Sequence, residues 1–489
     1  MEQSTSGGSG GRGTRRTAHE LARYEALFAA RTRGMKSSAM REMMALTERS
    51  DVISLAGGLP DTSTFAPELY ARLMAEVAES STARALQYGP TEGMAATVGC
   101  ILEVMAAEGT LVDPADVIVT TGGQQVIDLV CKTLIDPGDV IVAEAPTYPG
   151  AIPSFSAYQA DVEQIEIDED GMPIDALEAT LDRLQEQGRR PKFIYTIPNF
   201  QNPGGVTMSL ARRRRLVEVA RERELLVLED NPYGLLRYEG EPLPTLYSLD
   251  AEAVGRGGAS DLVIYLGTFS KILSPGLRLG WAVAPRPVLE KLNLGKQGSD
   301  LCSSPVTQMF VAAYFAERGA QSAEPAWVEY VERLKNLYRR RRDVMLESLE
   351  EHFGGRASWT RPEGGLFIWA TLQDGVDTTD LLARSKGVAF VPGRAAYMDG
   401  RRGSSSMRLN FAGVPDEDIR EGIRRIGRTM GGDTGLLGTL TGIPSPSRAP
   451  SAAEPEASTE DSPPLADIVE LPRRDAQDPA RPARRRRDR

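Results

Sequence analysis

The stretch Val263–Ala284, VIYLGTFSKILSPGLRLGWAVA, decides the fold that we predict for this chain. It opens with an apolar, β-branched run, Val263–Leu266, which predicts a buried strand. A small-polar loop follows and presents Lys271 beside Thr268 and Ser270. We therefore expect the lysine at the carboxyl end of a strand, where ligands bind in open α/β sheets.

A turn and a second strand complete this stretch. Pro275 and Gly276 predict a turn, Arg278 follows it, and residues 279–284 predict another buried strand. One ammonium, two hydroxyls and one guanidinium thus converge on a short loop between core elements. Such a set suits a phosphate-bearing carbonyl cofactor held on the lysine as a Schiff base. The simpler interpretation is that the two cations belong to an ordinary solvated loop.

This loop resembles the Schiff-base loop of the fold-type I pyridoxal phosphate (PLP) aminotransferases of class I/II, which reads Ser/Thr-x-Ser-Lys with an arginine seven residues later. The resemblance covers roughly residues 20–430 and favours the 2-aminoadipate and kynurenine aminotransferase branch. It implies an α/β fold, with a mostly parallel seven-stranded sheet between helices in a large domain and a smaller α+β domain. Alternating strand and helix signals independently support βαβ units.

Composition shifts and the resemblance divide the chain into five regions. We expect, in order, a disordered extension (1–18), an N-terminal segment joining the small domain (19–65), the large PLP-binding domain (66–320), the small C-terminal domain (321–430) and a disordered Pro/Ser/Arg-rich tail (431–489).

The overall composition excludes several classes of protein. The 489 residues carry 41% hydrophobic and 26% charged residues, as in soluble globular proteins, and a net charge of -11, which argues against a nucleic-acid partner. No apolar run reaches membrane length, and the amino terminus has no apolar signal core. Three scattered cysteines indicate reduced thiols and a cytoplasmic protein. With only two histidines, we predict no metal site.

A second motif predicts an anion site. The strand 117–120 ends in Gly122 and Gly123, and a helix begins at about Gln124. Free amides at a helix start bind anions, although a structural βα turn needs the same residues. The resemblance implies that the amides of Gly123 and Gln124 bind the PLP phosphate together with Thr268, Ser270 and Arg278. Many relatives carry serine at the Gly123 position, so one hydroxyl contact is absent here.

Other strand ends supply residues that suit the cofactor ring. Tyr148 could stack on an aromatic ring or pack in the core. Asp230 ends an apolar strand and could cap a turn, or it could face the pyridine nitrogen and keep it protonated. The resemblance implies the latter, and it places Asn202 and Tyr233 on the pyridine 3-oxygen. Asn202 is also an ordinary Asn-Pro turn residue.

The resemblance also implies substrate contacts. Arg408 would clamp the substrate α-carboxylate with Asn202, a task that suits a bidentate guanidinium, although it could be an edge-strand cation. Gly58, in the tight turn GGLP, would lie over the substrate. Arg41, otherwise a helix-surface cation, would help to select acidic or large side chains. Tyr88 would reach the partner's cofactor phosphate, which implies a homodimer with active sites shared across its interface.

We therefore expect a PLP-dependent aminotransferase that moves the amino group of an L-amino acid (2-aminoadipate-like, aromatic or branched) to a 2-oxo acid such as 2-oxoglutarate. The resemblance makes Lys271, Asp230 and Tyr233 the catalytic residues. Three alternatives stay open: a PLP-dependent C-S lyase, an aminotransferase-like regulator carrying a winged-helix domain, and a PLP-binding protein without turnover. The short Gly-rich extension before the body counts against the regulator.

Two runs of four arginines, 212–215 and 339–342, occur in expected helices. Four consecutive residues cover every side of a helix, so we expect both runs to be solvated rather than to form a nucleic-acid patch.

Overall fold

The computed structural model describes Tyr24 and residues 27–35, 51–255, 259–320, 323–373 and 375–441. Arg41, the predicted extension (1–18) and the tail beyond residue 441 lie outside the described residues. None of the helices in the described part of the chain combines the length and the apolarity that crossing a membrane requires.

A seven-stranded sheet forms the centre of the fold, in the order β2-β8-β7-β6-β5-β3-β4. Its strands are β2 (Val117–Thr120), β3 (Val140–Ala145), β4 (Asp161–Glu166), β5 (Phe193–Thr196), β6 (Leu226–Asp230), β7 (Val263–Thr268) and β8 (Gly280–Val283). β8 alone runs in the direction opposite to that of the other six strands. β2, β3, β5, β7 and β8 are buried along their whole length, as expected for strands covered on both faces. The predicted mostly parallel sheet is confirmed.

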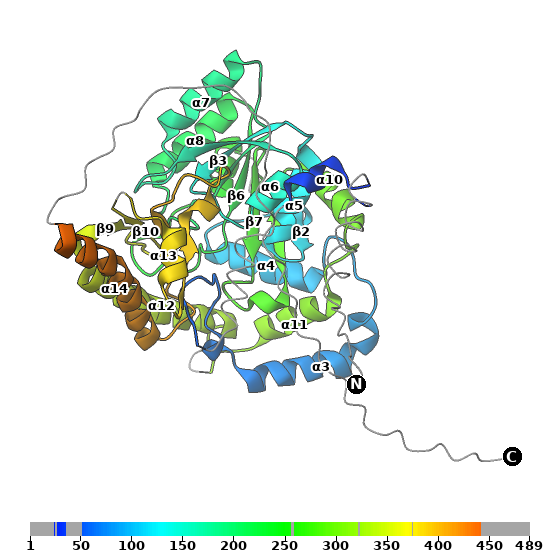
Figure 1. Cartoon of the computed structure of the whole chain (residues 1–489). Coiled ribbons are helices and arrows are strands. Elements are labelled where there is room, and N and C mark those ends of the chain that lie inside the picture. The colour runs from blue at the N-terminus through cyan, green and yellow to red at the C-terminus, as the bar shows by residue number, and fades with distance from the viewer. Residues whose placement is uncertain are drawn as a thin grey trace, which may run out of the picture. The chain divides into compact units, whose positions relative to one another are not determined.

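Helices enclose this sheet (Figure 1). They are α3 (Pro67–Ala85), α4 (Ala95–Ala107), α5 (Gly123–Leu134), α6 (Ile152–Ala157), α7 (Ile174–Glu186), α8 (Leu210–Glu222), α9 (Leu246–Val254), α10 (Arg286–Gln297) and α11 (Pro305–Ala316). The loops after β2, β3, β5, β6 and β7 all leave the carboxyl ends of strands that run in the same direction. These loops therefore meet at one edge of the sheet.

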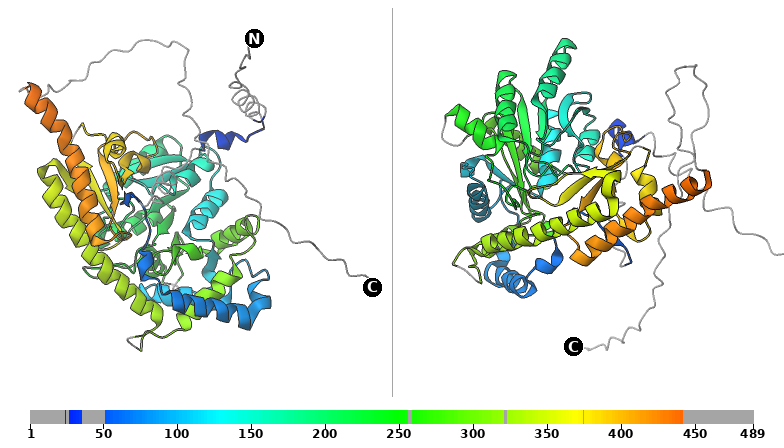
Figure 2. Two further views of the ribbon diagram at one scale, coloured as in Figure 1. Left: turned by 60° about the horizontal axis from the view of Figure 1, so that its bottom comes forward. Right: turned by 90° about the vertical axis from the view of Figure 1, so that its left-hand side faces the viewer.

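A second, antiparallel sheet has the order β12-β13-β10-β9. The C-terminal elements are α12 (Ala326–Phe353), β9 (Ala357–Trp359), β10 (Phe367–Leu372), α13 (Thr378–Arg384), β11 (Val388–Ala389), β12 (Val391–Pro392), β13 (Ser406–Asn410) and α14 (Asp416–Thr441). Figure 2 shows α12 and α14 side by side. β1 (Ile53–Ser54) pairs in parallel with β11, which supports the prediction that the N-terminal segment joins the small domain.

α14 continues to Thr441, past the boundary at 430 from which we expected disorder. The expectation rested on the change of composition from about residue 431, where two glycines follow one another, but a glycine inside a helix costs only about 1 kcal/mol relative to alanine. Once a helix is nucleated, each further residue adds a hydrogen bond, so it can extend through such a pair.

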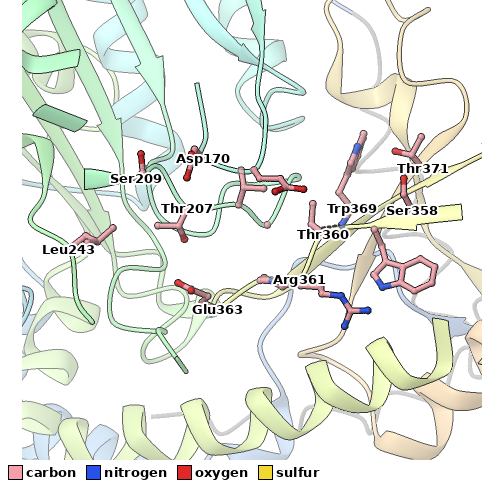
Figure 3. Close-up of a pocket in the computed structure, with 15 residues that line it drawn as sticks. Asp170, Thr207, Ser209, Leu243, Ser358, Thr360, Arg361, Glu363, Trp369 and Thr371 are labelled. Carbon is pink, nitrogen blue, oxygen red and sulfur yellow. Dashed lines mark hydrogen bonds between the residues drawn. The ribbon is translucent and has the colours of Figure 1, made fainter. Parts of the chain in front are cut away.

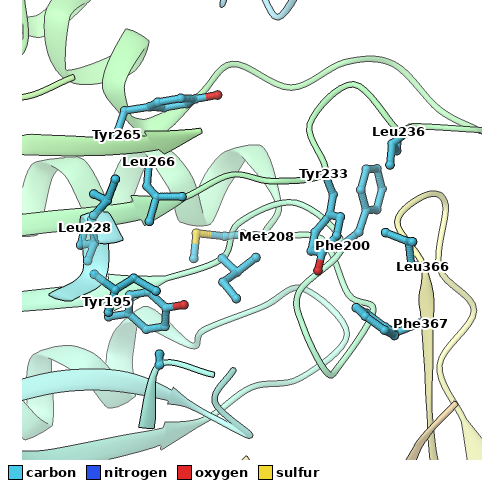
Figure 4. Packing of buried hydrophobic residues seen from close by; sticks show 14 of the residues in the cluster. Tyr195, Phe200, Met208, Leu228, Tyr233, Leu236, Tyr265, Leu266, Leu366 and Phe367 are labelled. Atoms are coloured by element: carbon cyan, nitrogen blue, oxygen red, sulfur yellow. The ribbon is translucent and has the colours of Figure 1, made fainter. Parts of the chain in front are cut away.

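Close packing joins the loop after β5 to β10. Figure 4 shows Phe200 and Tyr233 near Leu366 and Phe367. The rings of Tyr233 and Phe367 are arranged edge-to-face, with their centroids 6.1 Å apart. A Cβ added at Gly205 would lie 2.7 Å from the carbonyl oxygen of Phe367, so only glycine permits this approach. The contact brings the small sheet against the large one, and Trp369 of β10 pairs with Arg408 of β13.

The expectation that both arginine runs are solvated is wrong for three of their members. Arg213 is fully buried, and Arg341 and Arg342 are 6% and 4% exposed. Arg341 pairs with Asp61 at 2.6 Å and Arg342 with Glu239 at 2.7 Å. Four consecutive arginines indicate only that some of them lie on each side of the helix. In α8 and α12 one side faces loops that offer hydrogen-bond acceptors, so the arginines on that side are buried.

Arg213 shows what such a buried arginine does. Its Nε donates to the carbonyl oxygen of Met208 at 2.9 Å and its Nη1 to that of Pro244 at 2.9 Å. Its Nη2 donates to the carbonyl oxygen of Pro198 at 2.9 Å and to Asn199 Oδ1 at 2.6 Å. One guanidinium therefore joins two loops, 197–209 and 231–245, at the edge where the site lies.

We predict that Arg213→Ala lowers the free energy of unfolding by about 3 kcal/mol, because buried acceptors in two loops lose their donor. Arg214→Ala, at the exposed next position on the same helix, should change it by less than about 0.5 kcal/mol. Urea unfolding followed by circular dichroism measures both. Equal stability of the two variants would contradict the structural role of Arg213.

Candidate active site

The loops at the carboxyl edge of the large sheet enclose a cavity of about 140 Å³. Most of the predicted site residues line it: Gly123, Gln124, Tyr148, Asn202, Asp230, Tyr233, Thr268, Ser270, Lys271 and Arg278. They follow five different strands, so the parallel arrangement of those strands is what brings them together. Their contacts with a ligand stay predictions.

Lys271 lies in this cavity just after β7. Its Nζ donates a hydrogen bond to the carbonyl oxygen of Gly58 at 2.5 Å. Burial lowers the pKa of the Lys271 ammonium to about 8, and the nearby cations Arg408 and Arg278 add to the shift. A lysine with such a pKa is neutral for part of the time near neutral pH, so it can act as a nucleophile and as a base.

Asp230 is the buried carboxylate of the cavity, only 4% exposed. Burial raises the pKa of Asp230 to about 6, and a hydrogen bond from Tyr195 opposes the shift. The Tyr195 hydroxyl donates to Asp230 Oδ2 at 2.6 Å. A buried carboxylate with a neutral donor alone is costly, and a cationic N–H facing it would remove that cost. The site thus fits a ring with a protonatable nitrogen, such as pyridine.

Tyr195 was missed by the sequence analysis. It lies in β5, where it pairs with Leu228 of β6, two residues before Asp230. The available signal was a hydroxyl in the otherwise apolar strand FIYT, just before the Asn-rich loop. Alternation along a strand does not identify which neighbouring strand supplies a hydrogen-bond partner, so the contact needed the structure.

The anion end of the cavity depends on two glycines. Gly122 has φ +80° and precedes α5, and a Cβ there would lie 2.5 Å from Arg278 Nη2. A Cβ at Gly123 would lie 2.9 Å from Leu266 Cδ2, on a buried side chain. Glycine at 123, where many relatives carry serine, therefore matches the packing of β7. The hydroxyls of Thr268 and Ser270 lie nearby, 2.9 Å apart in a hydrogen bond.

Arg408 does not line the cavity, but it is bonded to Asn202, which does, and it is fully buried. Its Nη1 donates to Asn202 Oδ1 at 2.9 Å and its Nη2 to the carbonyl oxygen of Ala56 at 2.7 Å. Asn202 Nδ2 in turn donates to the Tyr233 hydroxyl at 3.4 Å. Burial lowers the pKa of Arg408 to about 10, so it stays a cation at neutral pH.

Phe367 is a second residue that the sequence analysis missed. The Arg408 guanidinium lies over its ring, 4.3 Å from the centroid. A Cβ at Gly58 would lie 3.2 Å from Phe367 Cζ, so the GGLP turn rests on the same ring. Phe367 therefore fixes both predicted substrate contacts, Arg408 and Gly58, although neither lines the cavity. An aromatic in an apolar strand gives no signal of this task.

Two predicted residues, Tyr88 and Arg41, remain. Tyr88 is 77% exposed and does not contact it, so its predicted contact requires a second chain. Arg41 lies outside the described residues.

A larger cavity of about 710 Å³ lies elsewhere, between the loop after Asn202 and the β9–β10 sheet. Figure 3 shows Thr207 and Ser209 on one side of it and Thr360 and Trp369 on the other. Its lining includes Glu169, Asp170, Arg361 and Glu363 but no lysine and none of the predicted site residues. Nor does the described part of the chain hold a group of three His, Cys, Asp or Glu side chains arranged for a metal ion. The smaller cavity is therefore the candidate site for the predicted cofactor.

Comparison with known proteins agrees with this geometry. The family model described as Aminotransferase class I and II matches residues 50–426. Aromatic-amino-acid aminotransferase 1 of Thermococcus litoralis is 44% identical over 410 residues, 83% of this chain and 94% of that protein.

Solved structures show the same likeness. A Pyrococcus horikoshii kynurenine aminotransferase in complex with PMP is 40% identical with a TM-score of 0.76, and the match covers 85% of this chain and 99% of that one. The alpha-aminoadipate aminotransferase of Thermus thermophilus, complexed with N-(5'-phosphopyridoxyl)-L-leucine, is 37% identical with a TM-score of 0.76, covering 84% and 99%. The predicted fold type and branch are confirmed.

Asp230 predicts how stability depends on pH in the protein freed of cofactor. The pKa of this carboxyl is about 6 when folded against 3.8 in its ordinary state, so folding takes up a proton between these values. Its stabilising contribution is complete below about pH 3.8 and is lost as pH rises through about 6. Between about pH 4.5 and about pH 7 this carboxyl should lower the free energy of unfolding by about 2 kcal/mol. We expect Asp230→Asn to abolish that part of the pH dependence.

Urea unfolding at both pH values measures this difference. Glu144 and Glu229 also have pKa values raised by burial, to about 7. Glu229 cancels in the comparison, whereas the Asp230 charge adds to the shift of Glu144, so the measured difference includes this effect of Asp230 on Glu144. Parallel pH profiles for the two proteins would show that Asp230 titrates normally.

Proposed function

The chain belongs to the class I and II aminotransferase family, and we propose that it transfers the amino group of an L-amino acid to a 2-oxo acid, with PLP held on Lys271. The observation that carries this proposal is one cavity containing both an amine of lowered pKa and a carboxylate of raised pKa. Aromatic, kynurenine and aminoadipate aminotransferases among the relatives support 2-aminoadipate-like, aromatic or branched amino donors. We propose 2-oxoglutarate as the acceptor.

When bound, the coenzyme supplies an electron sink for the charge that develops at the substrate Cα. Lys271 would hold the coenzyme through its amine. When free, the same amine would be the group placed to take up and return the proton of the substrate Cα. Because its pKa is about 8, it can both accept and return a proton near neutral pH.

The other residues of the cavity hold and orient. Asp230 keeps a proton on the pyridine nitrogen, and Tyr195 holds that carboxylate in place. Tyr233 and Asn202 donate to the 3-oxygen, and Tyr148 packs against the ring. The phosphate is bound by the amides of Gly123 and Gln124 with the side chains of Thr268, Ser270 and Arg278.

We assign substrate recognition to Arg408 and the residues around it. Arg408 binds the α-carboxylate, and its plane is set by Phe367 beneath it and by the bond to Asn202. Gly58 lies over the substrate, and Arg41 contributes to the choice of side chain. The carbonyl of Gly58, which accepts from Lys271, brings this turn to the reacting lysine.

We also propose a homodimer, in which the exposed Tyr88 reaches the partner's phosphate site. A cytoplasmic location suits Cys100 and Cys131, which are buried free thiols. Burial raises the pKa of Cys100 to about 12, so it has little reactivity toward oxidants.

A screen of half-reactions tests the function. We expect the purified protein with PLP to absorb visible light through the imine on Lys271. That absorbance should fall when 2-aminoadipate, an aromatic or a branched amino acid is added, and return with 2-oxoglutarate. Lys271→Ala should lose the imine and at least about 10⁴-fold of turnover, since the general base and the attachment point go together. Release of pyruvate and ammonia from cysteine conjugates, without any half-reaction, would favour the C-S lyase alternative.

Arg408→Lys tests the carboxylate clamp. A lysine is a single point charge that cannot present two parallel N–H groups, so we expect KM for the amino donor and for 2-oxoglutarate to rise at least about tenfold. Arg401→Lys, on an exposed turn of the small domain, is the matched control and should leave KM unchanged. An unchanged KM in Arg408→Lys would remove the clamp from the proposal.

A further inference from the structure

Lys296, near the end of α10, is a lysine with 0% exposure, which is rare for this residue type. Its Nζ donates to Gln125 Oε1 at 2.9 Å and to both carboxylate oxygens of Asp300, at 2.8 Å and 3.0 Å. The ammonium hydrogens thus all have acceptors. Nothing in the mechanism above uses this buried cation.

The acceptors of Lys296 hold the glycine turn before α5. Gln125 Oε1 also accepts from the amide of Thr121 at 2.8 Å, and Gln125 Nε2 donates to Asp300 Oδ2 at 2.8 Å. The Thr121 hydroxyl donates to Asp300 Oδ2 at 2.7 Å. Thr121 and Gln125 are the two ends of the segment that contains Gly122, Gly123 and Gln124. Both ends are therefore bonded to one ion pair, of which the lysine is buried and the aspartate is accessible to solvent.

Such an anchor has a physical purpose. Two consecutive glycines have more backbone freedom than any other pair, and that freedom must be lost before their amides can point at one anion. The helix start supplies the direction of the amides, but the bonds from outside the turn limit its movement. Because Lys296 is buried and its ammonium hydrogens all have acceptors, its position varies little.

We propose that Lys296, acting through Gln125 and Asp300, is a positioning residue that keeps the turn 121–125 in the shape that binds a phosphate group. The proposal rests on the proposed function, because the phosphate is that of PLP. Lys296 does not itself contact the cavity lining used for the ring, so its effect should be confined to the phosphate end.

The chain offers a matched control. Lys132 of α5 also links the same two helices, since its Nζ donates to the carbonyl oxygen of Gly295 at 3.2 Å and to Ser299 Oγ at 3.0 Å. It is exposed and lies at the other end of α5, away from the glycine turn. Its removal takes away a lysine between α5 and α10 without touching Thr121 or Gln125.

The experiment compares two probes, PLP and pyridoxal, which lacks the phosphate but forms the same imine on Lys271. Dissociation constants are measured by absorbance on the full chain freed of coenzyme. In Lys296→Met we expect PLP affinity to fall at least about tenfold and pyridoxal affinity to change less than about twofold. Lys132→Met should change neither. Thermal unfolding of each variant shows whether it is folded.

Gln125→Leu keeps the Lys296–Asp300 pair but removes the bond to the Thr121 amide, and it should show the same selective loss of PLP affinity even if Lys296→Met does not fold. Unchanged PLP affinity in the folded variants, or equal losses for PLP and pyridoxal, would overturn the positioning role. Failure of the wild-type protein to form an imine with either probe would instead overturn the proposed function, so the two failures are distinguishable.

Discussion

The burial of two opposite charges at one edge of a parallel sheet is the constraint on which this site depends. Lys271 and Asp230 both leave strands whose faces are covered, so neither can be fully hydrated. Burial moves each toward its neutral form, to a pKa of about 8 for the amine and about 6 for the carboxyl. The coenzyme that we propose suits both groups, since it has a carbonyl carbon that can bond to the amine and a ring nitrogen that can pair with the carboxylate. Its binding would therefore stabilise the fold that creates its site.

A single guanidinium joins the two sheets to this centre. Arg408 belongs to β13 of the small sheet, yet its hydrogen bonds go to Asn202 in the loop after β5 and to the carbonyl oxygen of Ala56 beside β1. Phe367, from the neighbouring β10, supports its flat face. As the carboxylate clamp that we propose, Arg408 would also hold the loop, the small sheet and the N-terminal segment in one arrangement. Substrate binding and the relation of these three segments are thus physically linked.

Sequence reasoning predicted the sheet and most of the cavity because the relevant residues follow strands with clear apolar runs and end in glycine, proline or asparagine. Lys271, Asp230 and Gly123 are of this kind, and each needed only its local pattern. Tyr195, Phe367 and Arg213 are of another kind, because their tasks depend on contacts between elements distant in the sequence. A run of arginines predicts a solvated helix when averaged over the helix. It cannot show that one of the four arginines faces two loops that offer three carbonyl oxygens.

The phosphate end shows how packing and recognition constrain one another. At 123 the backbone lies so close to Leu266 that a side chain would displace the buried core of β7, so a hydroxyl at this position would weaken the sheet that carries Lys271. Glycine removes that conflict but leaves the turn with more freedom and one donor fewer. The hydroxyl donors that we propose, Thr268 and Ser270, are on β7 and the loop that follows it, on the same segment as the lysine. The shape of the turn must then be held from outside it, and the ion pair of the buried Lys296 with Asp300 is placed to do this.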